Sequence, residues 1–165
     1  WFKKYNIEAE YSLTEVNENE IGIVLDKIKN DEIFGINITL PYKKKIIPFL
    51  QEIVNDAKLT GSVNTVFKDK KNNLIGENSD VYGLQAGYLN KIINNEKRNQ
   101  KALVLGAGGV SPSVIVSLKK SKIENIFLAN RTYEKTLFLK KQFKNATVFL
   151  NRFRAKCISY DKEDI

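Results

Sequence analysis

The fold of this chain is decided by the stretch 103–111, which reads Leu103-Val104-Leu105-Gly106-Ala107-Gly108-Gly109-Val110-Ser111. It begins as an apolar strand, turns on glycines and continues into a helix expected over Ser111 to Leu118. Gly106 permits the tight turn, and Gly108 lets the backbone approach a bound pyrophosphate. Backbone N–H groups at the helix start then face the phosphates. The pattern indicates a dinucleotide-binding turn, with a glycine-rich turn that binds no ligand as the alternative.

Downstream of this turn, the apolar pattern continues to alternate strands with helices. Ile126 to Ala129 predicts the next strand, Tyr133 to Phe143 the next helix, and Thr147 to Leu150 a third strand. Alternation of this kind implies a parallel sheet with helical crossovers, as in a Rossmann domain. From Asn151 onward the chain is charged and irregular, and its pattern predicts no element.

The end of the second strand carries the residues that choose between the two nicotinamide cofactors. About 20 residues after the glycine turn, proteins that bind NAD place an acid that contacts the ribose hydroxyls. This chain has Asn130, Arg131 and Thr132 there, with Lys135 one helical turn later. A carboxylate would repel a 2′-phosphate, whereas a guanidinium binds it through paired, charge-assisted hydrogen bonds. The sequence therefore predicts NADP, although Arg131 taken alone would be an ordinary exposed arginine.

Composition limits the chemistry available to the chain. It has no histidine and one cysteine, Cys157, which argues against a zinc site or a disulfide framework and fits a reducing cytoplasm. Acid–base chemistry must then rest on Lys, Asp, Glu or Tyr. The net charge of +8 comes from lysines scattered among acids, so we favour solvated surfaces over nucleic-acid binding. Attraction of an anionic substrate is a further interpretation. No apolar run approaches the roughly 18 residues of a membrane helix.

The first half of the chain predicts a second α/β domain, separated from the glycine turn by a polar linker over Asn94 to Lys101. Pro48 should kink or shorten the helix that contains it. The expected strands are Ala9 to Val16, Ile33 to Leu40 (buried), Val63 to Phe67 and Leu74 to Gly76, and the expected helices are Glu18 to Ile28, Pro41 to Leu50 and Ser79 to Ile93.

Three polar clusters interrupt this half, each at the edge of an expected strand, where open α/β sheets place ligands. Lys43 stands in an expected first helical turn, where the helix dipole disfavours a cation, and such a conflict can mark a site that attracts anions. Lys44 and Lys45 read as solvated. The clusters are Asn37-Ile38-Thr39-Leu40-Pro41-Tyr42-Lys43, Gly61-Ser62-Val63-Asn64-Thr65-Val66 and Gly76-Glu77-Asn78-Ser79-Asp80.

Together with the glycine turn and Asn130-Arg131-Thr132, these clusters resemble the shikimate dehydrogenase family. The family carries Asn-(Val/Ile)-Thr-x-Pro-x-Lys, Gly-Ala-Val-Asn-Thr, Gly-x-Asn-(Thr/Ser)-Asp-x-x-Gly, Gly-Ala-Gly-Gly and Asn-Arg-Thr segments. All five occur here in order, between Asn37 and Lys135. The departures are Ser62 for the usual alanine and Ser79 for the commoner threonine.

The resemblance implies a reaction and a role for each matching residue. The reaction would be the reversible reduction of 3-dehydroshikimate to shikimate with NADPH, in chorismate and aromatic amino-acid biosynthesis, without a metal. Lys43 would be the catalytic lysine and Asp80 its partner, close together between the domains, and Thr39 and Asn64 would hold the ring hydroxyls. NADP would be bound by Gly106, Ala107, Gly108, Gly109, Asn130, Arg131, Thr132 and Lys135.

The resemblance also sets the expected organisation. We expect a substrate-binding domain over residues 1–82, a bridging helix and linker over 83–100, and an incomplete Rossmann domain over 101–165. The family's serine-rich substrate segment and its glutamine-bearing C-terminal helix are not found, so the chain is expected to come from the middle of a longer enzyme. We expect a cytoplasmic monomer or homodimer with a small-molecule substrate and no nucleic-acid or membrane partner. The alternatives are a quinate/shikimate dehydrogenase paralogue that uses NAD and a non-catalytic nucleotide-binding domain.

Overall fold

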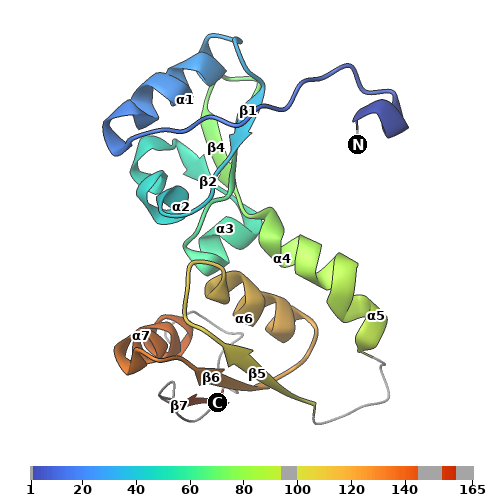
Figure 1. The fold of residues 1–165 in the computed structure, drawn as a ribbon, viewed down its shortest axis with the longest axis vertical. Helices are drawn as coiled ribbons and strands as arrows, with labels where there is room; N and C mark the ends of the chain where they lie inside the picture. The colour runs from blue at the N-terminus through green and yellow to red at the C-terminus, as the bar shows by residue number, and fades with distance from the viewer. Residues whose placement is uncertain (1, 94–99, 145–153, 159–165) are drawn as a thin grey trace.

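The computed structural model describes residues 2–93, 100–144 and 154–158, which form two α/β units (Figure 1). The first unit contains a four-stranded sheet and the second a three-stranded sheet. Each unit has its own cluster of buried hydrophobic side chains. The predicted fold class, two α/β units of which the second is a parallel β–α–β arrangement, is confirmed. Within these ranges no helix is long and apolar enough to cross a lipid bilayer.

The sheet of the first unit is mixed and has the strand order β1-β3-β4-β2. Strand β3 pairs antiparallel with both β1 and β4, and the short β2 pairs parallel with β4. Helix α1 buries Ile21, Leu25 and Ile28, a spacing that places all three side chains on one face of a helix. The bounds are β1 Gly35–Asn37, β2 Glu52–Ile53, β3 Thr65–Lys68, β4 Leu74–Glu77, α1 Ile21–Lys29, α2 Tyr42–Lys45 and α3 Asn55–Thr60, with 3-10 turns at Phe2–Tyr5, Glu18–Glu20 and Ile47–Phe49.

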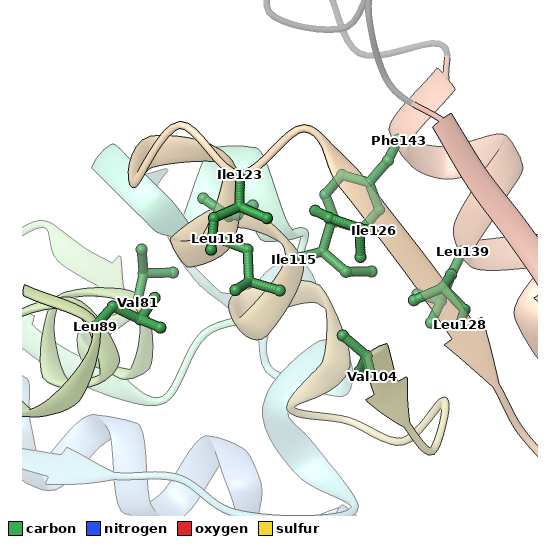
Figure 2. Packing of buried hydrophobic residues seen from close by; sticks show 11 residues of the cluster. Val81, Leu89, Val104, Ile115, Leu118, Ile123, Ile126, Leu128, Leu139 and Phe143 are labelled. Carbon is green, nitrogen blue, oxygen red and sulfur yellow. The ribbon is translucent and has the colours of Figure 1, made fainter. Parts of the chain in front are cut away.

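A long helical segment joins the two units. It begins with α4, Ser79–Leu84, directly after β4, continues through a π-helical turn at Gln85–Leu89 and ends with α5, Asn90–Ile92. Figure 1 shows it running from the first sheet along one side of the second unit. Val81 and Leu89 of this segment are buried in the hydrophobic cluster of the second unit (Figure 2). The segment therefore starts at the sheet of the first unit and packs as part of the second core.

The second unit is a parallel sheet with the strand order β5-β6-β7. Leu105 pairs with Ala129 at the ends of β5 and β6, so the glycine turn and the Asn130 loop leave the sheet at the same edge. Side chains from α6, β6 and α7 converge to form the buried cluster drawn in Figure 2. The bounds are β5 Lys101–Leu105, β6 Asn125–Ala129, β7 Arg154–Ile158, α6 Ser111–Lys120 and α7 Tyr133–Lys144.

The strand predicted at Ala9 to Val16 is wrong. Residues 7–17 have no regular secondary structure, and Tyr11 and Leu13 are 70% and 98% exposed. Alternation of apolar and polar residues shows which side chains share a face of a strand, but a strand also needs a neighbour for its backbone hydrogen bonds. This segment pairs with no strand among the described residues; instead, the carbonyl of Val16 accepts a hydrogen bond from the hydroxyl of Tyr42, at 2.8 Å.

The buried strand predicted at Ile33 to Leu40 is much shorter and more exposed than expected. Only β1 forms a strand there, at the edge of the sheet, and its Gly35 and Asn37 are exposed while Ile36 is half-buried. Phe34, just before it, is fully exposed. The helix predicted from Pro41 to Leu50 is also divided: α2 ends at Lys45, and the segment containing Pro48 forms only a 3-10 turn. Pro48 thus shortens the helix as expected.

Three further elements of the structure differ from the prediction. Strand β2 and helix α3 were not predicted, because Glu52–Ile53 and Asn55–Thr60 are too short to show a hydrophobic period. The third strand of the second sheet is β7, in the charged tail for which no element was predicted. The predicted strand Thr147 to Leu150, and residues 94–99 of the predicted linker, lie outside the described residues.

We expect Gly76→Ala to destabilise the first unit, because Gly76 lies in the inner strand β4 with no room for a side chain. A Cβ atom there would lie 2.5 Å from Leu50 Cδ1 and 2.9 Å from Val63 Cγ2. Overpacking of this kind costs about 1–3 kcal/mol. The control is Gly22→Ala in α1, where a Cβ would meet nothing within 4 Å and alanine should add about 0.5–1 kcal/mol. Urea unfolding measures both; shifts of the same sign would contradict the packing argument.

Candidate active site

Lys43 and Asp80 form an ion pair across the boundary between α2 and α4. They are 37 residues apart in the sequence, and the Lys43 ammonium donates to Asp80 Oδ2 at 2.7 Å. The lysine side chain is 12% exposed and the aspartate side chain 26%. The predicted proximity of the two residues is therefore found in the structure. Their exposure is low enough to limit screening of the pair by solvent, yet each side chain keeps some accessible surface.

Asn64 holds the second oxygen of the Asp80 carboxylate. Its side-chain N–H group donates to Asp80 Oδ1 at 2.8 Å, and its own carbonyl oxygen accepts from the backbone N–H of Ser79 at 2.9 Å. Asn64 is only 7% exposed. Its backbone is fixed as well, because it donates to the carbonyl of Glu77 at 3.0 Å and accepts from the N–H of Ile38 at 2.8 Å. Asn64 thus connects all three polar clusters of the first half.

The arrangement fixes the direction of the Asp80 carboxylate completely. One oxygen faces Lys43, the other faces Asn64, and the backbone N–H of Asp80 is bound by Asn78 Oδ1 at 3.0 Å. A lysine ammonium has three N–H donors, of which Asp80 uses one. The remaining donors can serve an oxygen of a bound ligand, with the carboxylate holding the ammonium in place. This geometry suits proton transfer to or from a ligand oxygen.

Sequence reasoning gave no role to two further polar residues of this network. Asn37 and Thr65 are paired in register across β1 and β3. The Asn37 amide donates to Thr65 Oγ1 at 3.2 Å, and the Thr65 hydroxyl donates to Asn64 Oδ1 at 3.0 Å. The signal that could have identified them is the pair of polar residues at matched ends of two neighbouring strands. Thr39 lies two residues beyond Asn37, where its carbonyl accepts from Tyr42 N–H at 3.0 Å and starts α2, and it is exposed.

The glycine turn after β5 has the backbone conformation that its sequence predicts. Gly106 has a φ of +105°, a value that favours glycine, and its N–H donates to the carbonyl of Ala129 at 2.7 Å. Ser111 occupies the third fingerprint position, and its hydroxyl donates to the carbonyl of Gly106 at 3.0 Å. The departure from glycine or alanine therefore adds a hydrogen bond that closes the turn. A Cβ at Gly106 or Gly108 would meet nothing within 4 Å, so the turn is open to a ligand.

Asn130 joins the glycine turn to the loop that follows β6. Its side-chain oxygen accepts from the N–H of Ala107 at 3.2 Å, and its amide donates to the carbonyl of Thr132 at 2.7 Å. The Ala107 N–H is thus engaged within the protein. Arg131 and Lys135 are exposed, and neither forms an ion pair with another residue in the described ranges. Both cations are therefore available to an anion bound at the turn.

The lysine-bearing segment and the glycine turn lie against each other. A Cβ placed on Gly109 would be 2.6 Å from Leu40 Cδ2, and Leu40 belongs to the same segment as Thr39 and Lys43. The absence of a side chain at Gly109 lets the two units approach at this point. Within the described ranges, no group of three acidic, histidine or cysteine residues could hold a metal ion.

The fold and the site define a class: a two-domain α/β protein in which a Rossmann-type unit adjoins a domain that carries a lysine–aspartate pair. Comparison with known families narrows the class. The shikimate dehydrogenase substrate binding domain matches residues 1–66, and the shikimate/quinate 5-dehydrogenase domain matches residues 88–161. The chain belongs to the shikimate dehydrogenase family.

Individual relatives agree with this assignment. The chain is 47% identical over 143 residues to shikimate dehydrogenase (NADP(+)) of Pelagibacter ubique, an alignment that covers 87% of this chain and 53% of that protein. The enzyme of the same name from Clostridium beijerinckii is 38% identical over 133 residues, covering 79% of this chain and 47% of that protein. The chain thus spans about half the length of the curated relatives that it matches.

Solved structures of this family also superpose on the chain. Shikimate dehydrogenase from Aquifex aeolicus does so with a TM-score of 0.77 and 31% identity, covering 99% of this chain and 55% of that one. A shikimate dehydrogenase solved in complex with NADP⁺ gives a TM-score of 0.79 and 31% identity, covering 96% of this chain and 53% of that one. The enzyme of Thermus thermophilus, solved with NADP(H) and shikimate, gives 0.77 and 26%, covering 94% and 54%.

We expect Asn64→Ala to cost more stability than Asn37→Ala. The first change leaves Asp80 Oδ1 and the N–H of Ser79 without their partner in a buried setting, which costs about 1–3 kcal/mol. Asn37 is exposed, so water can replace its hydrogen bonds, and the loss should stay within about 0.5 kcal/mol. Denaturant unfolding of the two variants gives the comparison. Equal losses would show that Asn64 does not hold the network together.

Proposed function

We propose that the full-length protein containing this chain is an NADP-dependent shikimate dehydrogenase that reversibly reduces 3-dehydroshikimate to shikimate. The observation that carries this proposal is the Lys43–Asp80 pair, which Asn64 holds and whose lysine-bearing segment packs against the glycine turn through Leu40. Support comes from the relatives whose names specify shikimate and NADP⁺ and from the related structures that contain these ligands. The expected pathway is the biosynthesis of chorismate and the aromatic amino acids.

The residues of the glycine turn fit a dinucleotide. The open space beside Gly106 and Gly108 leaves room for a pyrophosphate, and the start of α6 directs its dipole toward that space. Asn130 fixes the distance between the turn and the loop that carries Arg131. Arg131 and Lys135 supply the positive charge that a 2′-phosphate requires. When bound, the cofactor exchanges a hydride with the substrate carbon.

Lys43 is the proposed proton donor and acceptor at the substrate oxygen. As the ketone becomes an alcohol, its oxygen must receive a proton, and an ammonium held within hydrogen-bond reach can donate it. Asp80 keeps the ammonium oriented, because its carboxylate is itself fixed at both oxygens. In the oxidation direction, Lys43 takes the proton back. The chain has no histidine that could perform this step.

Substrate binding is proposed to use the polar groups around this pair. The exposed Thr39 hydroxyl can donate directly to a ring hydroxyl. Asn64 is buried and already donates to Asp80 and Ser79, so it contacts a ligand only by exchanging one of these hydrogen bonds. Its larger contribution is to hold Asp80 in position.

The proposal includes the domain limits expected from the sequence. These are a substrate-binding domain over residues 1–82, a bridging helix and linker over 83–100, and an incomplete Rossmann domain over 101–165.

Replacing Lys43 by alanine in the full-length protein should lower kcat by about 10²–10⁴-fold, because the group that transfers the proton is lost. NADPH affinity should be almost unchanged, since Lys43 lies on the first unit. The control is Lys45→Ala, on the same short helix, whose side chain pairs with Glu18 at the surface and should be dispensable for turnover. Steady-state kinetics and NADPH fluorescence titration give the two quantities. A parallel loss of turnover and cofactor affinity would indicate a structural role for Lys43.

Replacing Arg131 by aspartate should abolish or reverse the preference for NADP over NAD. A charge-assisted hydrogen bond to the 2′-phosphate contributes roughly 1.5–3 kcal/mol, which corresponds to about a tenfold to hundredfold preference. The variant removes the attraction and adds repulsion. Lys141→Asp, farther along α7, carries the same change of charge and should leave the ratio of affinities unaltered. Titration of each protein with both cofactors gives the two ratios. An unchanged ratio in Arg131→Asp, or a wild type indifferent to the 2′-phosphate, would refute the cofactor assignment and favour the NAD-using paralogue.

A further inference from the structure

Asn78 is a buried side chain whose hydrogen bonds join the two units. It is 2% exposed and lies at the junction of β4 and α4. Its amide donates to the carbonyl of Ser62 at 2.8 Å and lies 3.1 Å from both Thr60 Oγ1 and Ser113 Oγ. Its oxygen accepts from the N–H of Asp80 at 3.0 Å and lies 3.3 Å from Ser113 Oγ. One side chain therefore contacts α3, the loop after it, α4 and α6.

The orientation of this amide is fixed by its neighbours. The N–H of Asp80 can only donate, so the atom facing it must be the oxygen of Asn78. The carbonyl of Ser62 can only accept, so the atom facing it must be the nitrogen. Ser113 lies within reach of both ends, and a hydroxyl can donate or accept. Asn78 thus caps α4 at Asp80 and holds Ser113 at the same time.

Ser113 belongs to the helix that follows the glycine turn. It is the third residue of α6 and is 2% exposed. Two residues before it, Ser111 closes the turn through its hydrogen bond to Gly106. A displacement of Ser113 along α6 would therefore move the turn as well. The side chain of Asn78 thus connects the backbone N–H of Asp80 directly to the first turn of α6.

We propose that Asn78 and Ser113 act as a positioning pair, which holds the Lys43–Asp80 pair in a fixed position relative to the glycine turn. This inference rests on the function proposed above. Neither residue touches the reacting atoms; Asn78 acts through Asp80, and Ser113 acts through α6. The hydride and the proton must be transferred to two adjacent atoms of one substrate molecule. The Lys43–Asp80 pair and the nicotinamide must therefore keep a fixed distance and orientation relative to each other. A small error in such an arrangement lowers turnover without weakening the binding of either ligand.

The test compares Ser113→Ala with Ser117→Ala in the full-length protein. Ser117 lies one turn farther along α6 and is also buried. Its hydroxyl lies 2.7 Å from the carbonyl of Ser113 and 3.1 Å from the carbonyl of Val81, so it too lies between α6 and α4. It does not contact Asn78 or the cap at Asp80. Ser113→Ala should lower kcat about three- to tenfold, as expected for one hydrogen bond, with KM for shikimate, Kd for NADP⁺ and the melting temperature close to those of Ser117→Ala. Ser117→Ala should keep the wild-type kcat.

A second variant checks the same contact from the other side. Asn78→Ser keeps a residue that caps helices well but is too short to reach Ser113. It should lower kcat by at least the same factor, with an additional fall in melting temperature because the carbonyl of Ser62 and the hydroxyl of Thr60 also lose their partner. Adding Ser113→Ala to Asn78→Ser should lower kcat no further, because the contact that it removes is already lost.

The outcomes separate this inference from the proposed function. A wild-type protein that does not oxidise shikimate with NADP⁺ would refute the proposed function itself. An active wild type whose kcat is unaffected by Ser113→Ala, or is lowered equally by Ser117→Ala, would overturn the positioning role. The positioning role would also be overturned if KM, Kd and melting temperature all changed together with kcat in Ser113→Ala, or if adding Ser113→Ala to Asn78→Ser lowered kcat further.

Discussion

The carboxylate of Asp80 is the group on which the arrangement of the site depends. Lys43 from α2 binds one of its oxygens, Asn64 from the loop before β3 binds the other, and Asn78 binds its backbone N–H. These partners come from three separate segments that share no local pattern. Each would be displaced if the sheet of the first unit formed in another register, because Asn64 and Asn78 stand directly beside paired strands. The register of four short strands thus determines the geometry of the lysine.

A buried polar network of this kind is stable only when its members satisfy one another. Asn64 and Asn78 are 7% and 2% exposed, and a buried polar group without a partner costs about 1–3 kcal/mol. Both amides use their donors and acceptors within the protein, so the cost of removing them from water is offset. Such a network is also rigid, since no member can rotate without leaving another unsatisfied. Rigidity at Asp80 keeps the Lys43 ammonium in a fixed position, as the proton transfer proposed for it requires.

The sequence predicted the second unit better than the first. The β5–α6–β6–α7 order follows from apolar periods several residues long and from one glycine turn, all of which are local signals. The first unit has strands of two to four residues and helices of four to nine, too short for a period to be read with certainty. Its polar clusters nevertheless led to Lys43, Asp80 and Asn64 through their resemblance to the family's segments, which can be recognised where no hydrophobic period is present. The contacts of Asn78 with Ser113 could not be predicted, since they join residues 35 positions apart through tertiary packing alone.

The three glycines of the turn have two different surroundings: two face open space and one packs against the first unit. Beside Gly106 and Gly108 the space is open, as a bound phosphate group requires, whereas Gly109 is in close contact with Leu40. Leu40 immediately precedes the segment that starts α2 and carries Lys43. The lysine segment is therefore packed against the turn on one side, while Asn78 ties Asp80 to α6 on the other. The segments that carry Lys43 and Asp80 thus each have a contact with the second unit, through Leu40 and Asn78 respectively. The packing of the two units therefore determines where the ammonium lies relative to the glycine turn.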